Sequence, residues 1–383
     1  MWEGESVKRL LMTSITALLL SVCTAWADTL EDGVTAYFRS DYANALIIFE
    51  SLAAQGNAKA QVGLGKMYGN GQGVKKDYAE ALKWYQLAAA QGEAAAQFMI
   101  GSMYEEGRGV GKDYTEALKW YRLAANQGDA NAQLVLGVIY DKGQDVPQDY
   151  EEALKWYQLA TAQENTQAQF NLGKMYYEGR GVRQDYAEAV RLFQLAAARG
   201  NAAAAFNLGL MYRKGQGVAQ DYTEALKWYR LAAAQDNVQA QSDLGWMYEK
   251  GLGVRQNYAV ALNWYRLAAV QGNAQAQFDL GSAYYNGQGV KKDYAEALKW
   301  YRLAAVQGNA QAQSDLGLIY AKGEGVTQDY VRAYMWFNLG AASGNATAVK
   351  NRDALTQLMA PPAITQAQKM ARECEQRKFK DCD

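Results

Sequence analysis

The chain of 383 residues is too long for one ordinary compact core, and its 39 Lys and Arg against 40 Asp and Glu leave a net charge of −1. This balance lacks the basic excess that marks nucleic-acid-binding proteins, so we expect no nucleic-acid partner. The sequence contains no His, which excludes an imidazole general base, Ser-His-Asp and Cys-His catalysis, and zinc sites with His ligands.

The first 27 residues are typical of a signal peptide. Lys8 and Arg9 precede an apolar stretch over residues 10–22, and Ala-Trp-Ala at residues 25–27 is a cleavage pattern. The apolar stretch is shorter than the ~20 residues of a membrane span. We therefore expect a periplasmic or secreted protein with no integral membrane span once residues 1–27 are removed. An uncleaved anchor and a lipidated Cys23 are the alternatives.

A unit of 36 residues is repeated eight times without a gap over residues 58–345. Residues 28–57 are interpreted as a degenerate opening half-repeat, which resembles the second half of a unit only. One helix pair of this length cannot bury its apolar face alone, so the copies are expected to stack on their neighbours. The units begin at Ala58, Ala94, Ala130, Thr166, Ala202, Val238, Ala274 and Ala310.

The first half of each unit is predicted to be a helix, here called helix A, that ends in a glycine turn. In the second copy, Ala96, Ile100 and Tyr104 share one face of a 3.6-residue period. The turn reads Gly-x-Gly-Val in seven copies, a pattern that suits a left-handed helix exit. The third copy departs from it, with Gly-Gln-Asp-Val at residues 143–146 followed by Pro147.

The second half of each unit is predicted to be helix B. It begins with a capping-box pattern in six copies, as Asp113 and Glu116 show in the second. An apolar stripe follows, with Trp at one position in seven copies and Leu192 in the fourth. Such a column could form a ladder for a ligand, but its helical spacing in every copy favours a place in the core.

The copies share the pattern A-x-A-Q-x-x-L-G-x-M-Y-x-x-G-x-G-V-x-x-D-Y-x-E-A-L-K-W-Y-x-L-A-A-x-Q-G-N, which resembles the Sel1-like repeat over about residues 34–345. The resemblance implies an all-α fold, an α/α superhelical solenoid of helix-turn-helix repeats related to tetratricopeptide repeats, with helices A lining a concave surface. It also implies a protein-protein interaction scaffold or adaptor, and an exported bacterial member would act in the cell envelope. Some exported relatives have been discussed as binding or hydrolysing β-lactams.

Residues 346–383 are predicted to cap the solenoid. Residues 346–348 begin as helix A does but lack its Leu-Gly core, and Pro361 with Pro362 is expected to end this helix. A last helix is expected over residues 364–379. Cys374 and Cys382 remain after removal of the signal peptide, and we expect them to form a disulfide that staples the tail.

The positions that vary between copies share one face of helix A, because the second, sixth, ninth and thirteenth residues of a unit are spaced by four, three and four. This variable stripe is apolar in the amino-terminal half, at Met99 and Val135 for example, and acidic in the carboxy-terminal half. We hypothesise that it binds a basic or amphipathic segment of a partner protein, with Trp246 as the anchor. A plain solvated face is the alternative. The candidate partner-binding residues are Leu210, Asp243, Trp246, Asp279 and Asp315.

The sequence gives little support for a catalytic site. Asp243, Asp279 and Asp315 would lie ~10 Å apart on successive helices, which is loose for a carboxylate pair. The Ser-x-x-Lys nucleophile of β-lactam enzymes does not occur after residue 27, no strand precedes the Gly-x-Gly turns, and no EF-hand loop is present. We predict a binding scaffold for a protein or peptide, with no catalytic residue, cofactor or metal. A cell-wall or β-lactam-related ligand binder or hydrolase is the alternative.

Overall fold

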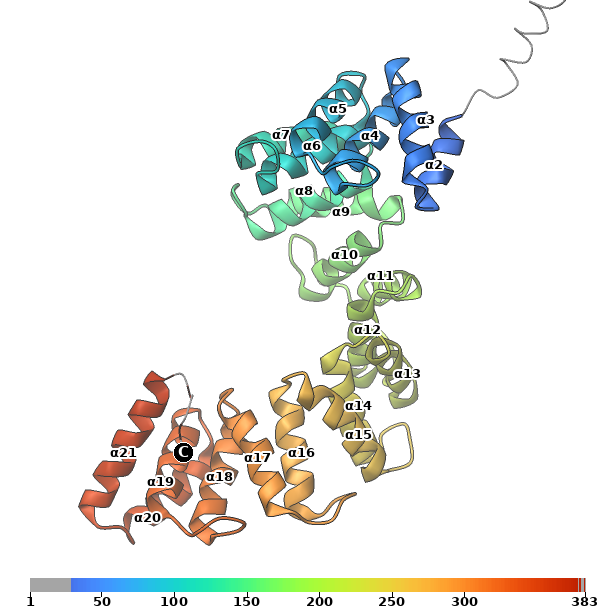
Figure 1. Ribbon diagram of the computed structural model, residues 1–383. Helices are drawn as coiled ribbons and strands as arrows, with labels where there is room; N and C mark the ends of the chain where they lie inside the picture. Colours follow the sequence, from blue (N-terminus) through green and yellow to red (C-terminus); the bar gives the residue numbers. More distant parts are fainter. Residues whose placement is uncertain (1–28, 378, 380–381, 383) are drawn as a thin grey trace, which may run out of the picture. The chain divides into compact units, whose positions relative to one another are not determined.

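The computed structural model describes residues 29–377, 379 and 382 (Figure 1). The described residues form 20 helices and no strand, which confirms the expected all-α fold. They divide into two compact units, one of residues 29–168 and 180–182 and the other of residues 169–179 and from 183 onward. Consecutive helices pack against each other from α2 to α9 in the first unit and from α11 to α20 in the second. The expected signal peptide lies outside the described residues.

The helices of the two units have regular lengths. The first unit contains α2 (Leu30–Phe38), α3 (Tyr42–Ala54), α4 (Ala58–Asn70), α5 (Tyr78–Ala90), α6 (Ala94–Glu106), α7 (Tyr114–Asn126), α8 (Ala130–Lys142) and α9 (Tyr150–Ala162). Helix α10 (Thr166–Glu178) begins at the boundary of the units. The second unit continues with α11 (Tyr186–Ala198), α12 (Ala202–Lys214), α13 (Tyr222–Ala233), α14 (Val238–Lys250), α15 (Tyr258–Val270), α16 (Ala274–Asn286), α17 (Tyr294–Ala305), α18 (Ala310–Lys322), α19 (Tyr330–Ala342), α20 (Ala346–Thr356) and α21 (Pro361–Gln376).

The helix ends follow from the capping residues of the repeat. Helix α14 begins after Asn237, whose side chain accepts a hydrogen bond of 2.9 Å from the backbone N–H of Ala240. It ends at Gly251, which adopts the left-handed conformation with φ 70°. Helix B of the same repeat begins after Asn257, which caps the N–H of Val260. Capping by side chains and glycine at the two ends therefore sets the 13-residue length of helix A.

The core of each repeat is a contact between a glycine of helix A and an aromatic ring of helix B. A Cβ atom placed on Gly245 would lie 2.5 Å from the Tyr265 ring, so only glycine lets the ring pack against the helix backbone. The rings at this position of helix B, here called the Tyr column although two of them are Phe, are at most 2% exposed in every copy. The Tyr column consists of Tyr85, Tyr121, Tyr157, Phe193, Tyr229, Tyr265, Tyr301 and Phe337.

The Trp column expected in the core is less deeply placed than the Tyr column. Trp156, Trp300 and Trp336 are buried, whereas the Trp residues of four other copies are half-buried. The deepest position is taken by the next residue along helix B, because its ring lies closest to the glycine of helix A. The half-buried Trp residues are Trp84, Trp120, Trp228 and Trp264.

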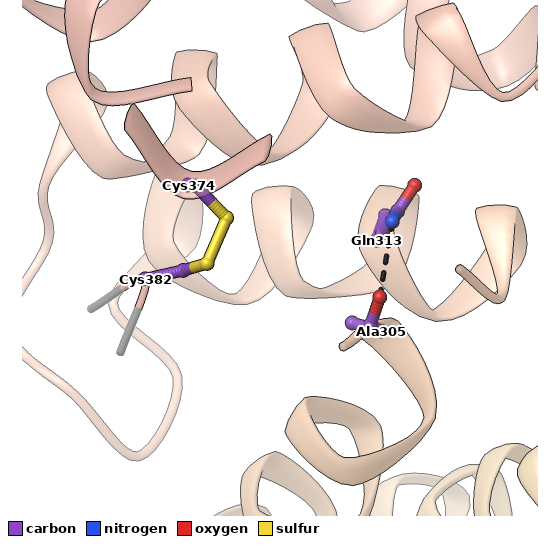
Figure 2. The surroundings of a disulfide bond; sticks show 4 residues. All are labelled: Ala305, Gln313, Cys374 and Cys382. Atoms are coloured by element: carbon purple, nitrogen blue, oxygen red, sulfur yellow. Dashed lines mark hydrogen bonds between the residues drawn. A yellow bond between two sulfur atoms is a disulfide. The ribbon is translucent and has the colours of Figure 1, made fainter. Parts of the chain in front are cut away.

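A buried glutamine links neighbouring repeats. The amide of Gln313 donates a 3.0 Å hydrogen bond to the carbonyl of Ala305, at the end of the preceding helix B (Figure 2). In the seventh repeat, Gln277 donates in the same way to Ala269 at 3.0 Å and accepts from Gln307 at 2.7 Å. The glutamine thus gives a helix-end carbonyl a second donor, beside the backbone N–H of Gly308 or Gly272 that also bonds to it.

The opening segment is more complete than the half-repeat expected from the sequence. Helix α2 precedes α3 and forms a pair with it, so the first half of the unit is present in shortened form. Thr29 and Asp32 form a capping box at the start of α2. A Cβ atom placed on Gly33 would lie 2.8 Å from the Phe49 ring, so glycine is needed for this ring to pack against α2. The short turn at residues 39–41 hid this pair, because it lacks the Gly-x-Gly-Val pattern.

Two further helices, α20 and α21, close the carboxy-terminal end. Pro361 and Pro362 occupy the first turn of α21, where a missing N–H costs nothing, so this helix begins before the expected residue 364. Helix α21 packs against α19, and the disulfide between Cys374 and Cys382 joins its last turn to the tail (Figure 2). Among the described residues, no helix is both long and apolar enough to cross a membrane.

Candidate functional site

The five candidate binding residues all lie on helices A of the second unit. Leu210 is on α12, Asp243 and Trp246 are on α14, and Asp279 and Asp315 are on α16 and α18. The three Asp residues occupy the same position of successive repeats, one turn or less from the glycine that packs on the Tyr column. All five side chains are half-buried. The stripe is therefore part of the packed surface of the repeats, and its members are more enclosed than ordinary solvated residues.

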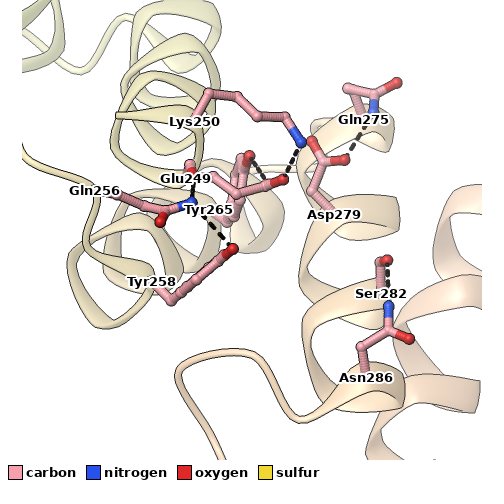
Figure 3. Close-up of polar contacts among 9 residues, drawn as sticks. All are labelled: Glu249, Lys250, Gln256, Tyr258, Tyr265, Gln275, Asp279, Ser282 and Asn286. Carbon is pink, nitrogen blue, oxygen red and sulfur yellow. Dashed lines mark hydrogen bonds and ion pairs between the residues drawn. The ribbon is translucent and has the colours of Figure 1, made fainter. Parts of the chain in front are cut away.

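Each of the last two acids is held by a glutamine one helical turn before it. The Gln275 amide donates a 2.9 Å hydrogen bond to Asp279 (Figure 3). In the next repeat, Gln311 donates one of 3.1 Å to Asp315. The i, i+4 spacing places donor and acceptor on the same helix face. These glutamines orient the carboxyl groups, but one neutral donor replaces little of the water that a carboxylate loses on burial.

Burial raises the pKa of Asp279 to about 7 and that of Asp315 to about 6. For Asp279 the hydrogen bond from Gln275 and the charge of Lys250 act in the opposite direction, while the negative charge of Glu249 adds to the rise. Burial also raises the pKa of Asp243, where Arg213 opposes it. The stripe thus holds carboxyl groups whose charge is not fully compensated by this chain.

A second layer of polar groups lies between the aspartates. Tyr265, from the buried column, donates a 2.8 Å hydrogen bond to Glu249, which also pairs with Lys250 at 2.6 Å (Figure 3). Burial and the charges of Asp279 and Glu249 raise the pKa of Tyr265, so its hydroxyl remains a donor at physiological pH. Glu249 therefore has two donors, in contrast to Asp279 with its single glutamine.

Trp246 is not an exposed anchor. It is half-buried, and its ring packs against the cores formed by the repeats on both sides. The Arg213 guanidinium of α12 lies 5.2 Å from the centre of its ring, which is a cation–π distance. The ring therefore already accepts one cation from this chain.

The sequence reasoning missed three contributors to this site: Arg213, Glu249 and the glutamines that hold the aspartates. One signal was available. The sixth, seventh and eighth repeats alone combine Gln at the second position with Asp at the sixth, as Gln239 and Asp243 do. Two polar residues spaced by four on a variable face indicate a held carboxylate. The role of Arg213 has no such local signal, because it depends on the neighbouring helix.

The site offers recognition chemistry in the form of half-buried acids, amide groups and two partly exposed apolar side chains. Within the described residues, no group of three or more Asp, Glu or Cys residues is arranged to hold a metal ion. Partly desolvated carboxylates beside an aromatic ring suit ammonium or guanidinium groups, which can pair with the acid and rest on the ring.

Comparison with known proteins defines the class to which this stack of 36-residue helix pairs belongs. The Sel1 repeat model matches eight consecutive segments, and Sel1 repeat proteins are generally protein-interaction scaffolds. The chain belongs to the Sel1 repeat family. The matched segments are residues 58–93, 94–129, 130–165, 166–201, 202–237, 238–273, 274–309 and 310–345.

Two solved structures are similar to this chain over most of its length. A protective antigen of uropathogenic Escherichia coli that displays an SLR fold is 32% identical, covers 95% of this chain and 96% of its own, and gives a TM-score of 0.50. A Sel1 repeat protein from Oxalobacter formigenes is 35% identical, with 82% and 91% covered and a TM-score of 0.61. The comparison with curated proteins gives no match.

Proposed function

We propose that this protein is a non-catalytic scaffold that binds a partner protein through the acidic part of the variable stripe. The bound segment carries Lys or Arg next to apolar residues. The observation that supports this most is the repetition of a half-buried Asp at one position of three successive helices, α14, α16 and α18. Core packing does not require an acid there, since the same position holds Met99 and Val135 in earlier repeats.

The energetics favour a cationic partner. A half-buried carboxylate with only a partial counter-charge is unfavourable, and burial raises the pKa of Asp279 to about 7 although Lys250 opposes the rise. An ammonium or guanidinium group placed beside it would stabilise the charged form and lower that pKa. Trp246 supplies apolar area on the same helix as Asp243, and Leu210 supplies it on α12, the preceding helix A. Apolar area of this kind suits the centre of a protein interface.

We propose an extracytoplasmic location, in the periplasm or beyond it. The disulfide between Cys374 and Cys382 supports an oxidising compartment. The signal peptide expected at residues 1–27 agrees with export, and the 32% identical relative is a protective antigen. Fusion of residues 1–40 to a reporter that is active only after export tests this proposal. A reporter that stays inactive would contradict it.

Selection of peptides from a random library on the purified protein tests the binding site. We expect the selected peptides to be enriched in Lys or Arg beside an aromatic or aliphatic residue. The double substitution Asp279→Asn and Asp315→Asn keeps the shape of both side chains and should weaken binding at least about tenfold. Trp246→Ala should weaken it as well.

Asp236→Asn is the matched control. Asp236 lies in the same unit, is exposed and adopts a left-handed conformation that Asn tolerates, so the variant removes one charge outside the stripe. Its affinity should equal that of the unmodified protein. Selected peptides without basic residues, or affinities that do not change in the double variant, would contradict the proposed site.

A further inference from the structure

The turn of the third repeat differs from those of the other copies. It reads Gly143-Gln144-Asp145-Val146, and Asp145 stands where the other seven copies have a glycine. Asp145 adopts a positive φ of 60°, the conformation that its glycine counterparts adopt freely. A side chain is therefore held at a position that the rest of the solenoid keeps empty.

The glycines at this position allow a close approach to the preceding helix B. A Cβ atom on Gly109 would lie 2.8 Å from the backbone of Tyr78, and one on Gly289 would lie 2.7 Å from the backbone of Tyr258. Real Cβ atoms do not approach so closely. Because Asp145 carries a Cβ, its turn must stand farther from Tyr114, the equivalent residue of the helix that precedes it.

A cavity of about 330 Å³ lies at this turn. It reaches from Tyr114 and Leu118 on α7 to Ile139 on α8 and to the turn residues Asp145 and Val146. At the equivalent place four repeats later, between Tyr258, Leu262 and Gln288, the cavity is about 10 Å³. The two places share the fold and most of the lining, so the aspartate in the turn accounts for the larger space.

The lining of the larger cavity is apolar with an acidic edge. Glu105 accepts a 2.5 Å hydrogen bond from the Tyr121 hydroxyl, and Asp145 is exposed at the turn. Arg122 is the one basic residue among the lining residues, and it donates to the Tyr140 hydroxyl at 2.5 Å. The two carboxylates face this guanidinium within the lining, and the Lys112 ammonium acts on both of them from outside it.

The aromatic ring at the edge of the cavity already has an ammonium group near it. The Nζ atom of Lys112 lies 4.6 Å from the centre of the Tyr114 ring, although Lys112 does not line the cavity. Lys76 and Lys292 lie over the equivalent rings Tyr78 and Tyr294. The surroundings of these rings therefore accept a cation.

We propose that the cavity at the turn of the third repeat binds a compact organic cation, with an ammonium or guanidinium group on an apolar body. The body lies on Tyr114, Leu118 and Ile139, and the charged group faces Asp145 and Glu105. The volume falls at the lower end of small-molecule sites. The cation can be a free amine or a Lys side chain of a peptide, and this site is independent of the stripe in the second unit.

Calorimetric titration of the purified chain with phenethylammonium and with acetyl-lysine amide tests the proposal, the first probe representing a free amine and the second a peptide. We expect saturable binding of at least one of them. The uncharged 2-phenylethanol and the anionic 3-phenylpropionate should bind at least about fivefold more weakly, which corresponds to the loss of one partly exposed charge contact.

Two substitutions of Asp145 separate the charge from the cavity. The Asn side chain in Asp145→Asn tolerates the same left-handed conformation and leaves the cavity open, so binding of the cation should weaken at least about fivefold. Asp145→Gly lets the turn close as in the other repeats, and binding should disappear while the chain folds at least as well by circular dichroism and melting temperature. Asp236→Asn, far along the sequence, serves as the charge control.

Three results would overturn the proposal. Neither cation binds the unmodified chain, or Asp145→Gly binds as tightly as the unmodified chain, or the neutral and anionic probes bind as tightly as the cations. Because Asp145→Asn changes no backbone requirement, retained affinity in that variant would also reject the role of the carboxylate. None of these outcomes depends on Asp279 or Asp315.

Discussion

Asp279 and Asp315 show how a single residue responds to its place in the stack. Both acids follow a glutamine by one turn and both lose part of their water, so burial raises the pKa of the first to about 7 and of the second to about 6. Glu249, Lys250 and Tyr265 are the charged or titratable neighbours that act on Asp279. The acids therefore contribute to folding and to binding with opposite dependence on pH.

The contribution of Asp279 and Asp315 to the free energy of unfolding is expected to fall as pH rises from about 4 to 7. An Asp in the unfolded chain has a pKa of about 3.9, so in this window the folded chain holds more protons, and stability decreases until Asp279 is ionised. We expect Asp279→Asn to match the unmodified chain near pH 4 and to exceed it by about 1–2 kcal/mol at pH 8, less than the full shift because the carboxyl still contacts water.

Urea unfolding at a series of pH values measures this difference. Asp236→Asn should follow the unmodified chain at every pH. Binding of a basic peptide to the stripe should show the reverse trend and strengthen from pH 5 to 8, because the carboxylates must be ionised to pair with it. An Asp279→Asn curve parallel to that of the unmodified chain would show that this acid has an ordinary pKa.

At the scale of the helix pair, the buried glutamine is the contact that joins one repeat to the next. Gln277 lies between the carbonyl of Ala269 and the amide of Gln307. We expect Gln277→Ala to lower the free energy of unfolding by about 1–2 kcal/mol, because two hydrogen bonds are lost. The Ala269 carbonyl keeps the N–H of Gly272, and the Gln307 amide keeps the carbonyl of Leu303. Urea unfolding of the two chains checks this value.

The fifth repeat provides the matched control, because Ala205 replaces the glutamine there. Gln235, the counterpart of Gln307, donates to the carbonyl of Leu231 at 3.3 Å. Gln235→Ala should therefore cost less than about 0.5 kcal/mol, whereas Gln307→Ala should cost about 1 kcal/mol or more. Equal costs at the two sites would mean that the buried glutamine does not contribute to coupling between repeats.

At the scale of the whole molecule, stability is expected to be local, because each repeat contacts its neighbours along the chain. Reduction of the Cys374–Cys382 disulfide should lower the protection of α21 against hydrogen exchange by about 2–3 kcal/mol, the value expected for a loop of this length. The protection of α19, on which α21 packs, should fall as well. Helices α4 to α8 of the first unit should keep their protection. Hydrogen exchange measured by mass spectrometry resolves the two regions.

The double variant Cys374→Ala and Cys382→Ala controls for effects of the reductant. It should reproduce the local loss without any reducing agent. A loss of protection in α4 to α8 in either experiment would show that the solenoid unfolds as one cooperative body, and the nearest-neighbour description would then be wrong for this chain.

The sequence by itself determined the repeat, its two helices, their caps and the family. These features depend on residues within one 36-residue unit, and eight copies display the same local pattern, so periodicity and capping chemistry suffice to predict them. The sequence also marked Asp243, Asp279 and Asp315 as members of one face, since spacing along a helix sets the face. It did not show the opening helix pair, where a shortened turn hid helix α2.

Only the tertiary structure decided how deeply each residue lies and what covers it. The Tyr column lies deeper than the Trp column because a glycine on the other helix of the pair faces it. Arg213 covers Trp246 from a different repeat, and the cavity beside Tyr114 exists because Asp145 holds a turn away from the preceding helix. These features depend on distances between elements that no pattern within one unit specifies.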